Sequence, residues 1–131
     1  MQDCKPASTP MEPGLKLSAK STSPIVDESL FRQLAGSLIY LTATKPDISF
    51  AVSYISRLMT APKADHWTAE KRVLRSVSGT FDYGLLYTWS PNPTLCGYID
   101  SNWVDSVDDR KSTIGYVFNL GSSAVTRTSK K

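Results

Sequence analysis

The pattern of apolar and polar positions divides the chain into three parts with different periodicities. Residues 1–26 hold four prolines and many Ser, Thr and Lys, with only isolated apolar positions such as Met11 and Leu15. From Asp27 apolar residues recur at helical spacing, and after Gly79 they alternate as in strands. The pattern therefore predicts an extended, unpacked arm at 1–26, a helical region at 27–80 and a β region at 81–131.

Three helices with short connections are predicted in the helical region, packed as a bundle. The first begins at Asp27 as N-cap and ends before Lys45-Pro46, since a residue before proline avoids the helical conformation. Its apolar stripe consists of Leu30, Leu34, Leu38 and Leu41, widened by Phe31, Ala35 and Ile39. Gly36-Ser37 within it predicts the close approach of a neighbouring backbone.

The second helix is expected from Pro46, and the third from Pro62 to about residue 78, with Gly79 as its stop signal. The second has an apolar stripe of Ile48, Val52, Ile55 and Met59. The third presents Lys71, Arg72 and Arg75 opposite its apolar side. These three cations are interpreted either as a solvated charged face or as a nucleic-acid contact.

Strands are predicted at residues 83–88, 95–99, 113–120 and 124–129, the last two joined by a hairpin at 121–123. A polar loop, residues 101–112, separates the middle strands. Because no helical pattern follows the last strand, we expect one face of this sheet to remain uncovered. The fold class is thus α+β.

Composition changes this picture little. The 131 residues are 40% hydrophobic and 21% charged, which is typical of a globular chain, and the net charge of +3 permits contact with a polyanion without requiring it. Two cysteines, Cys4 and Cys96, form no framework and indicate reduced thiols. The sequence shows no signal peptide and no membrane-spanning stretch, which favours a cytoplasmic or nuclear location.

Several blocks in order and spacing resemble the Pol polyprotein of copia-type LTR retrotransposons. They are FRQLAGSLIYL at 31–41, KPDI at 45–48, PKADH at 62–66, GT at 79–80, YGLLY at 83–87, DDRKST at 108–113 and GYVF at 115–118. The resemblance implies the end of the reverse transcriptase, with its thumb and connection, running into the start of the ribonuclease H domain. The arm resembles an internal Pol segment, so Met1 is expected to be an internal methionine of a fragment or remnant.

The resemblance implies that Asp100 matches the first metal-binding carboxylate of the ribonuclease H site. That chemistry needs several carboxylates around two magnesium ions, and in the family the others lie after the third strand. Asp100 is therefore expected to bind metal only if missing partners are supplied, and the chain alone to have no cofactor and no enzymatic activity. The Tyr-x-Asp-Asp motif of the polymerase does not occur in this sequence.

Other acids do not complete the site. Asp105, Asp108 and Asp109 fit a solvated loop of alternating charge better than a metal cluster. The chain also departs from the family pattern at Asn102, where an aspartate is usual, and around Arg127, where a tryptophan is usual. His66 is interpreted as a capping or packing residue, and Trp67, Trp89 and Trp103 as core or sheet-edge aromatics.

Arg72-Val73-Leu74-Arg75 also spells the Arg-x-Leu-Arg string of oomycete effectors, which follows a signal peptide in that class. The helical periodicity already explains the string as two core residues between two surface arginines. The sequence therefore favours a catalytically incomplete Pol fragment. A secreted effector acting in a host cell and a residual nucleic-acid-binding module, with template-primer or RNA:DNA hybrid as partner, remain the alternatives.

Overall fold

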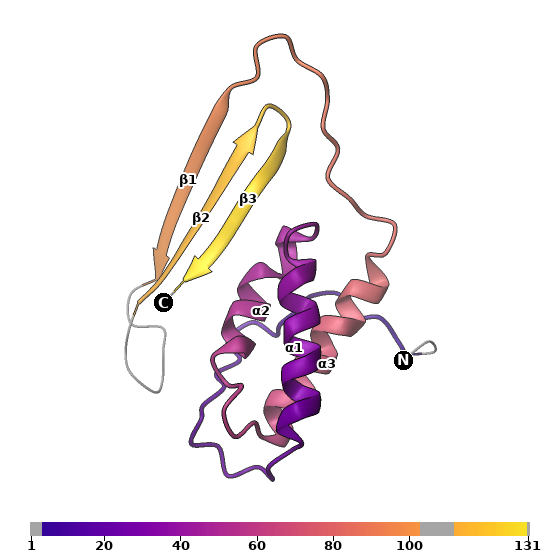
Figure 1. Cartoon of the computed structure of the whole chain (residues 1–131), viewed down its shortest axis with the longest axis vertical. Coiled ribbons are helices and arrows are strands. Elements are labelled where there is room, and N and C mark those ends of the chain that lie inside the picture. The colour runs from indigo at the N-terminus through magenta and orange to yellow at the C-terminus, as the bar shows by residue number, and fades with distance from the viewer. Residues whose placement is uncertain (1–3, 103–111, 131) are drawn as a thin grey trace.

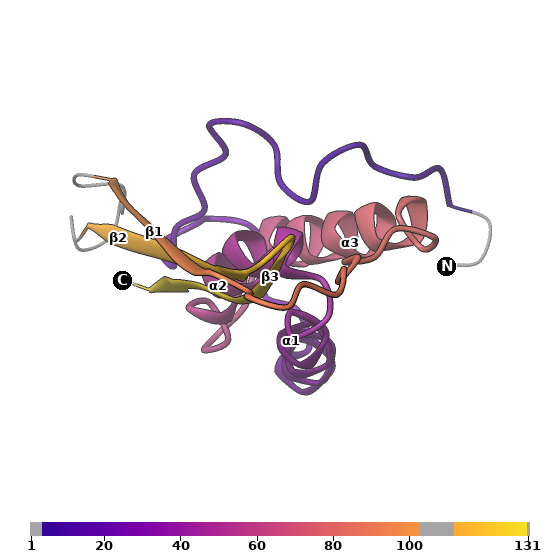
Figure 2. The same cartoon turned by 90° about the horizontal axis from the view of Figure 1, so that it is seen from above.

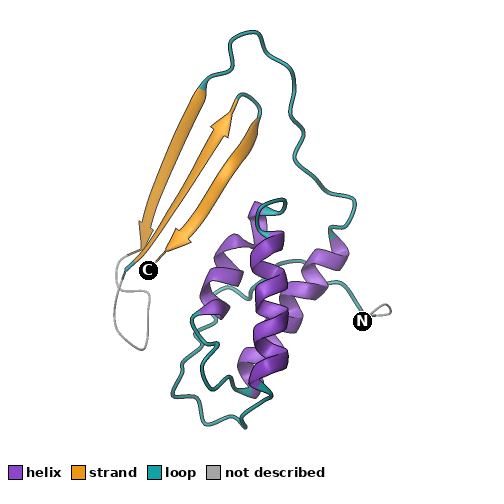
Figure 3. Ribbon diagram, in the orientation of Figure 1, coloured by secondary structure: helices purple, strands orange, loops and turns teal. Residues whose placement is uncertain are grey.

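The computed structural model describes residues 4–102 and 112–130, with Asn102, Thr113 and Lys130 described by their backbone alone. The described residues form the helices α1 (Glu28–Leu41), α2 (Ser49–Ser56) and α3 (Ala64–Gly79), then the strands β1 (Leu95–Asn102), β2 (Thr113–Leu120) and β3 (Ser123–Lys130). The helices pack together and the sheet lies beside them (Figures 1 and 3). The α+β class predicted from the sequence is confirmed.

Helix α1 begins where the sequence predicted. The Asp27 side chain accepts a hydrogen bond from the backbone N–H of Leu30 at 2.9 Å, as an N-cap does. Its buried side is centred on Phe31, Ala35 and Leu38, whereas Leu30 is 55% exposed, so the predicted stripe is rotated by about one residue. The expectation for Gly36 is wrong, because no neighbouring atom lies within 4 Å of where its Cβ would be.

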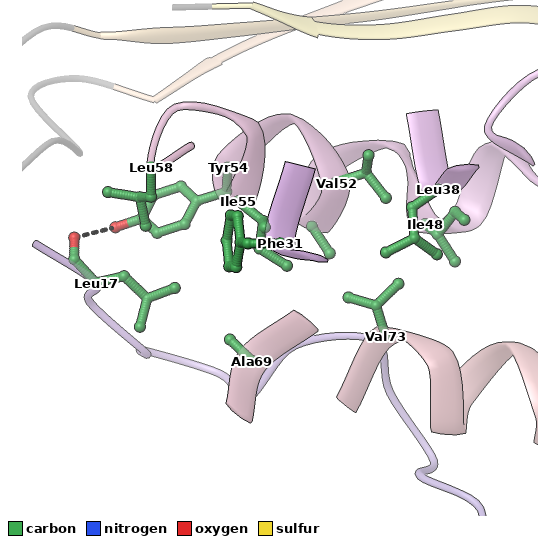
Figure 4. Close-up of a cluster of buried hydrophobic side chains, with 11 residues drawn as sticks. Leu17, Phe31, Leu38, Ile48, Val52, Tyr54, Ile55, Leu58, Ala69 and Val73 are labelled. Carbon is green, nitrogen blue, oxygen red and sulfur yellow. Dashed lines mark hydrogen bonds between the residues drawn. The ribbon is translucent and has the colours of Figure 1, made fainter. Parts of the chain in front are cut away.

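The second predicted helix is a 3₁₀ turn at Pro46–Ile48 that leads directly into α2. Proline suits this first turn because its missing N–H needs no partner there. Ile48, Val52 and Ile55 are buried as predicted, and they are joined in the core by Tyr54 and Leu58 (Figure 4). Helix α3 begins two residues after Pro62 and closes the core with Ala69 and Val73.

The arm at residues 4–26 has no regular secondary structure, but the expectation that it is unpacked is wrong. Leu17 is only 5% exposed and belongs to the core, with Met11, Leu15 and Val26 packed against it. The Tyr54 hydroxyl donates to the Leu17 carbonyl at 3.4 Å (Figure 4). Viewed from above, the arm runs along α3 (Figure 2). The helical core therefore includes the arm.

The three strands form an antiparallel sheet in the order β1-β2-β3, and the β2–β3 hairpin turns at Gly121, whose φ of 60° suits glycine. Cross-strand pairs such as Ile99 with Tyr116 place apolar side chains on one face. Ile99 is 77% exposed, and Leu95, Ile114 and Tyr116 on the same face are also exposed. The expectation of an uncovered apolar face is confirmed for the described residues.

The predicted strand at residues 83–88 is wrong: this segment is extended but joins no ladder. Side-chain hydroxyls of the β2–β3 turn serve its backbone instead. Ser122 and Ser123 both donate to the Leu86 carbonyl, and the Thr88 N–H donates to Ser122 Oγ at 3.2 Å. The Leu86 carbonyl and the Thr88 N–H are therefore bonded to side chains and not to a neighbouring strand, so the strand-like pattern does not produce a strand.

Candidate functional site

Asp100 lies near the end of β1, opposite Gly115 of β2, which in turn lies opposite Ser129 of β3. The next row of the sheet whose side chains point to the same side consists of Tyr98, Val117 and Arg127. Because side chains alternate along a strand, Asp100, Tyr98 and Arg127 share the face opposite to Ile99 and Tyr116. The sheet therefore presents Asp100, Tyr98 and Arg127 on one side, and the exposed Leu95, Ile99, Ile114 and Tyr116 on the other.

The sheet meets α2 through β3. The Ser53 hydroxyl of α2 donates to the Ser129 carbonyl of β3 at 2.6 Å and ties helix and sheet together. Beside this contact lies an open cavity of about 280 Å³, lined by Phe50 of α2 and by β1, β2 and β3 residues that include Tyr98, Asp100 and Arg127. Asp100 is thus part of a cleft between the sheet and the helices.

The donors that the described residues bring to this cleft do not fit a pair of magnesium ions. Among those described residues Asp100 is the single carboxylate in the lining, and Arg127, a permanent cation, lines the same cavity. Among the described residues no three His, Cys, Asp or Glu side chains gather as metal ligands would. Two hard cations require several carboxylate oxygens. The loop acids Asp105, Asp108 and Asp109, and Trp103, lie outside the described residues.

Arg127 links this cleft to a second cavity of about 420 Å³. Phe50 and Arg127 line both cavities, and the second is completed by Asp47, Tyr54 and residues 10–16 of the arm. The rings of Phe50 and Tyr54 stack with their centroids 6.1 Å apart. The residue that departs from the family pattern therefore lies where the arm, α2 and the sheet meet.

The predicted basic side of α3 is only partly open. Lys71 is exposed, and its Nζ lies 5.1 Å from the centroid of the Trp67 ring. Arg72 is partly covered by the arm: its guanidinium donates to Glu12 Oε1 at 2.9 Å and to Thr9 Oγ1 at 3.2 Å. Arg75 is also half-buried, and its backbone carbonyl accepts the Ala7 N–H at 3.3 Å. Helix and arm thus share this surface.

The interpretation of His66 as a capping and packing residue is confirmed. Its Nδ1 accepts the Lys63 N–H at 3.1 Å at the start of α3, so Nε2 carries the hydrogen and donates to the Ser18 carbonyl at 3.0 Å. Trp67 packs partly against the core, with its ring centroid 6.3 Å from that of Phe31. Trp89, by contrast, is 93% exposed in the segment before β1, so a core or sheet-edge role is wrong for it.

Sequence reasoning missed Glu70, a residue of α3 that is 0% exposed. Neither carboxylate oxygen has a hydrogen-bond partner among the described residues. Burial raises the pKa of this carboxyl to about 8, because the charged form loses its hydration. A signal was present in the sequence: Glu70 lies three residues before Val73 and four after His66, on the buried side of the helix.

No helix among the described residues is long and apolar enough to cross a bilayer.

No family model matches the chain, and no solved structure matches it. Several curated proteins do.

The relatives extend over all or most of the chain. It is 40% identical over its whole length to the retrovirus-related Pol polyprotein from transposon RE2 of Arabidopsis thaliana, and covers 9% of that polyprotein. It is 39% identical over its whole length to an uncharacterized mitochondrial protein of the same plant, of which it covers 54%. The secreted RxLR effector protein 161 of Plasmopara viticola is 41% identical over 73% of the chain, and 68% of the effector is covered.

The whole-length matches include a second Arabidopsis transposon polyprotein, RE1, at 40% identity. These matches agree with the sequence blocks distributed from α1 to β2. The chain belongs to the family of copia-type retrotransposon Pol polyproteins.

Proposed function

We propose that the chain is a piece of the reverse transcriptase and ribonuclease H region of a copia-type Pol polyprotein, with a thumb-like helical part and the first strands of a ribonuclease H-like sheet. The observation that carries this proposal is the apolar face of β1 and β2, on which Leu95, Ile99 and Ile114 are exposed. Soluble monomers rarely leave such contiguous apolar surface open. A sheet that belongs to a larger domain explains it.

The second part of the proposal is that the chain has no complete active site, needs no cofactor alone and is not an enzyme alone. It is supported by the cleft, where the described lining residues include Asp100 and Arg127 but no second carboxylate. A magnesium titration followed by calorimetry tests this. We expect no saturable binding at millimolar magnesium, in the chain and in Asp100→Asn alike. Saturable binding that Asp100→Asn abolishes would contradict it.

A second candidate function is residual nucleic-acid binding by Lys71, Arg72 and Arg75. It is favoured by the exposure of Lys71 next to the Trp67 ring, since a cation beside an aromatic suits a phosphate and a base. Binding to an RNA:DNA hybrid should weaken steeply with salt and with the double substitution Lys71→Glu and Arg75→Glu. A salt-independent signal, or none at low salt, rules this function out.

The effector alternative receives less support from the structure. Arg72-Val73-Leu74-Arg75 lies within α3, where Val73 is 0% exposed and Leu74 packs against the core. A string so placed is not presented as an exposed linear motif. The similarity to the Plasmopara effector is explained by the same proposal if both proteins descend from Pol sequences. The genomic sequence upstream of Met1 distinguishes a Pol origin from an effector origin: the first predicts the paired aspartates of the polymerase palm there, and the second predicts a signal peptide.

A further inference from the structure

The N-terminal arm divides at Gly14 into an anchored part and a weakly held part. Residues 15–18 are anchored, because Leu17 is in the core and the Ser18 carbonyl accepts from His66. Gly14 has a φ of 74°, a conformation that other residues seldom adopt. The chain therefore has a defined turning point between the core and residues 4–13.

The weakly held part lies on the basic side of α3 through a few contacts. The Ala7 N–H donates to the Arg75 carbonyl, and Thr9 and Glu12 accept from the Arg72 guanidinium. Pro6 lies against Gly79, where an added Cβ would be 2.8 Å from the Pro6 Cβ. The Glu12 side chain is 61% exposed, and exposed ion pairs hold weakly. Within this part Met11 also packs against the core. Residues 4–13 are thus held by the partly buried Met11 side chain and by these surface contacts.

The arginines beneath the arm are incompletely satisfied. The Nε atoms of Arg72 and Arg75 are buried and have no hydrogen-bond partner among the described residues. A buried donor without a partner is unfavourable. A phosphate has more acceptor oxygens than the single carboxylate of Glu12 and suits the planar guanidinium donors. The same surface therefore suits a polyanion better than it suits the arm.

We propose that residues 4–13 are an autoinhibitory strap, in which Glu12 occupies the position of a nucleic-acid phosphate on Arg72, and that nucleic acid binds α3 only when this strap turns away at Gly14. This inference rests on the nucleic-acid-binding function proposed above. It adds that the site is closed in the free chain and that its apparent affinity is lowered by the fraction of closed molecules.

The test is the affinity of Glu12→Gln for a fluorescent RNA:DNA hybrid at low salt, measured by anisotropy. We expect binding about two- to fivefold tighter than that of the unmodified chain, the range that loss of one exposed ion pair allows. The matched control is Glu28→Gln, which makes the same charge change but removes the Glu28–Arg32 pair of α1. Deleting the arm is a poorer test, because it also removes Lys5.

A second measurement follows the strap directly. The Ala7 amide should exchange its hydrogen faster when saturating hybrid is added, because binding separates it from the Arg75 carbonyl. Equal affinities of Glu12→Gln and Glu28→Gln, with Ala7 still protected in the complex, would overturn the strap and leave binding intact. Absence of binding in every variant, Glu12→Gln included, would overturn the binding function itself.

Discussion

The buried carboxyl of Glu70 should make the stability of this chain fall as the pH rises. Glu70 is 0% exposed and neither oxygen has a partner among the described residues, so its ionised form is strongly disfavoured in the folded state. Replacing it by Gln removes the ionisation and keeps the shape. Replacing it by Met removes the polar group as well.

The size of the effect follows from the change in pKa from 4.5 to about 8 on folding. Below pH 4.5 both states are protonated and there is no penalty. Between pH 4.5 and about 8 the folded chain retains a proton that the unfolded chain releases, so the free energy of unfolding falls by about 1.4 kcal/mol per pH unit. At pH 7 the accumulated loss is roughly 3 kcal/mol, and above about pH 8 it levels off.

Urea unfolding followed by circular dichroism at pH 5, 7 and 8.5 measures this. Glu70→Gln and Glu70→Met should lose the Glu70 contribution to the pH slope and be more stable than the unmodified chain at pH 7, by up to roughly 3 kcal/mol. Glu28→Gln, at an exposed site, should change stability by less than about 1 kcal/mol and keep the slope. If Glu70→Gln showed the same dependence of stability on pH as the unmodified chain, the reasoning would be refuted.

Three further predictions test the fold, two of them with a companion variant. Leu17→Ala should lower the free energy of urea unfolding by about 2–4 kcal/mol, because the arm completes the core. Leu30→Ala, at a position 55% exposed, should lower it much less. Equal losses in the two variants would contradict a packed arm. Asp27→Ala should lower the free energy of unfolding by about 1 kcal/mol, because α1 loses its N-cap. An unchanged stability would show that the cap contributes nothing. Gly97→Ala should destabilise the sheet, since its Cβ would lie 2.6 Å from the Phe118 ring, and Phe118→Leu should relieve that cost; a neutral Gly97→Ala would exclude the close contact.

The helices were predictable because their signals are local. Asp27 caps α1, and the spacing of Ile48, Val52 and Ile55 reports the buried side of the segment that becomes a 3₁₀ turn and α2. The registers of neighbouring strands follow similarly from alternation and from the turn at Gly121. The placement of Asp100 near the end of the first strand was predictable for the same reason.

What the sequence did not reveal depends on contacts between distant segments. Leu17 is an isolated apolar residue among Ser and Lys, so no periodicity shows that it enters the core. The segment at 83–88 has a strand pattern, but Ser122 and Ser123 serve its backbone through their side chains. The presence of Arg127 and Asp100 in the lining of one cavity, and the pairing of Arg72 with Glu12, likewise require the assembled fold.

The most direct test of the central claim, that this Pol piece has no complete active site, is magnesium-dependent cleavage of an RNA:DNA hybrid by the purified chain. Asp100→Asn is the matched variant, because it removes the family-matched carboxylate and keeps the side-chain shape. We predict no cleavage above background for either protein. Cleavage by the unmodified chain that Asp100→Asn abolishes would contradict the claim.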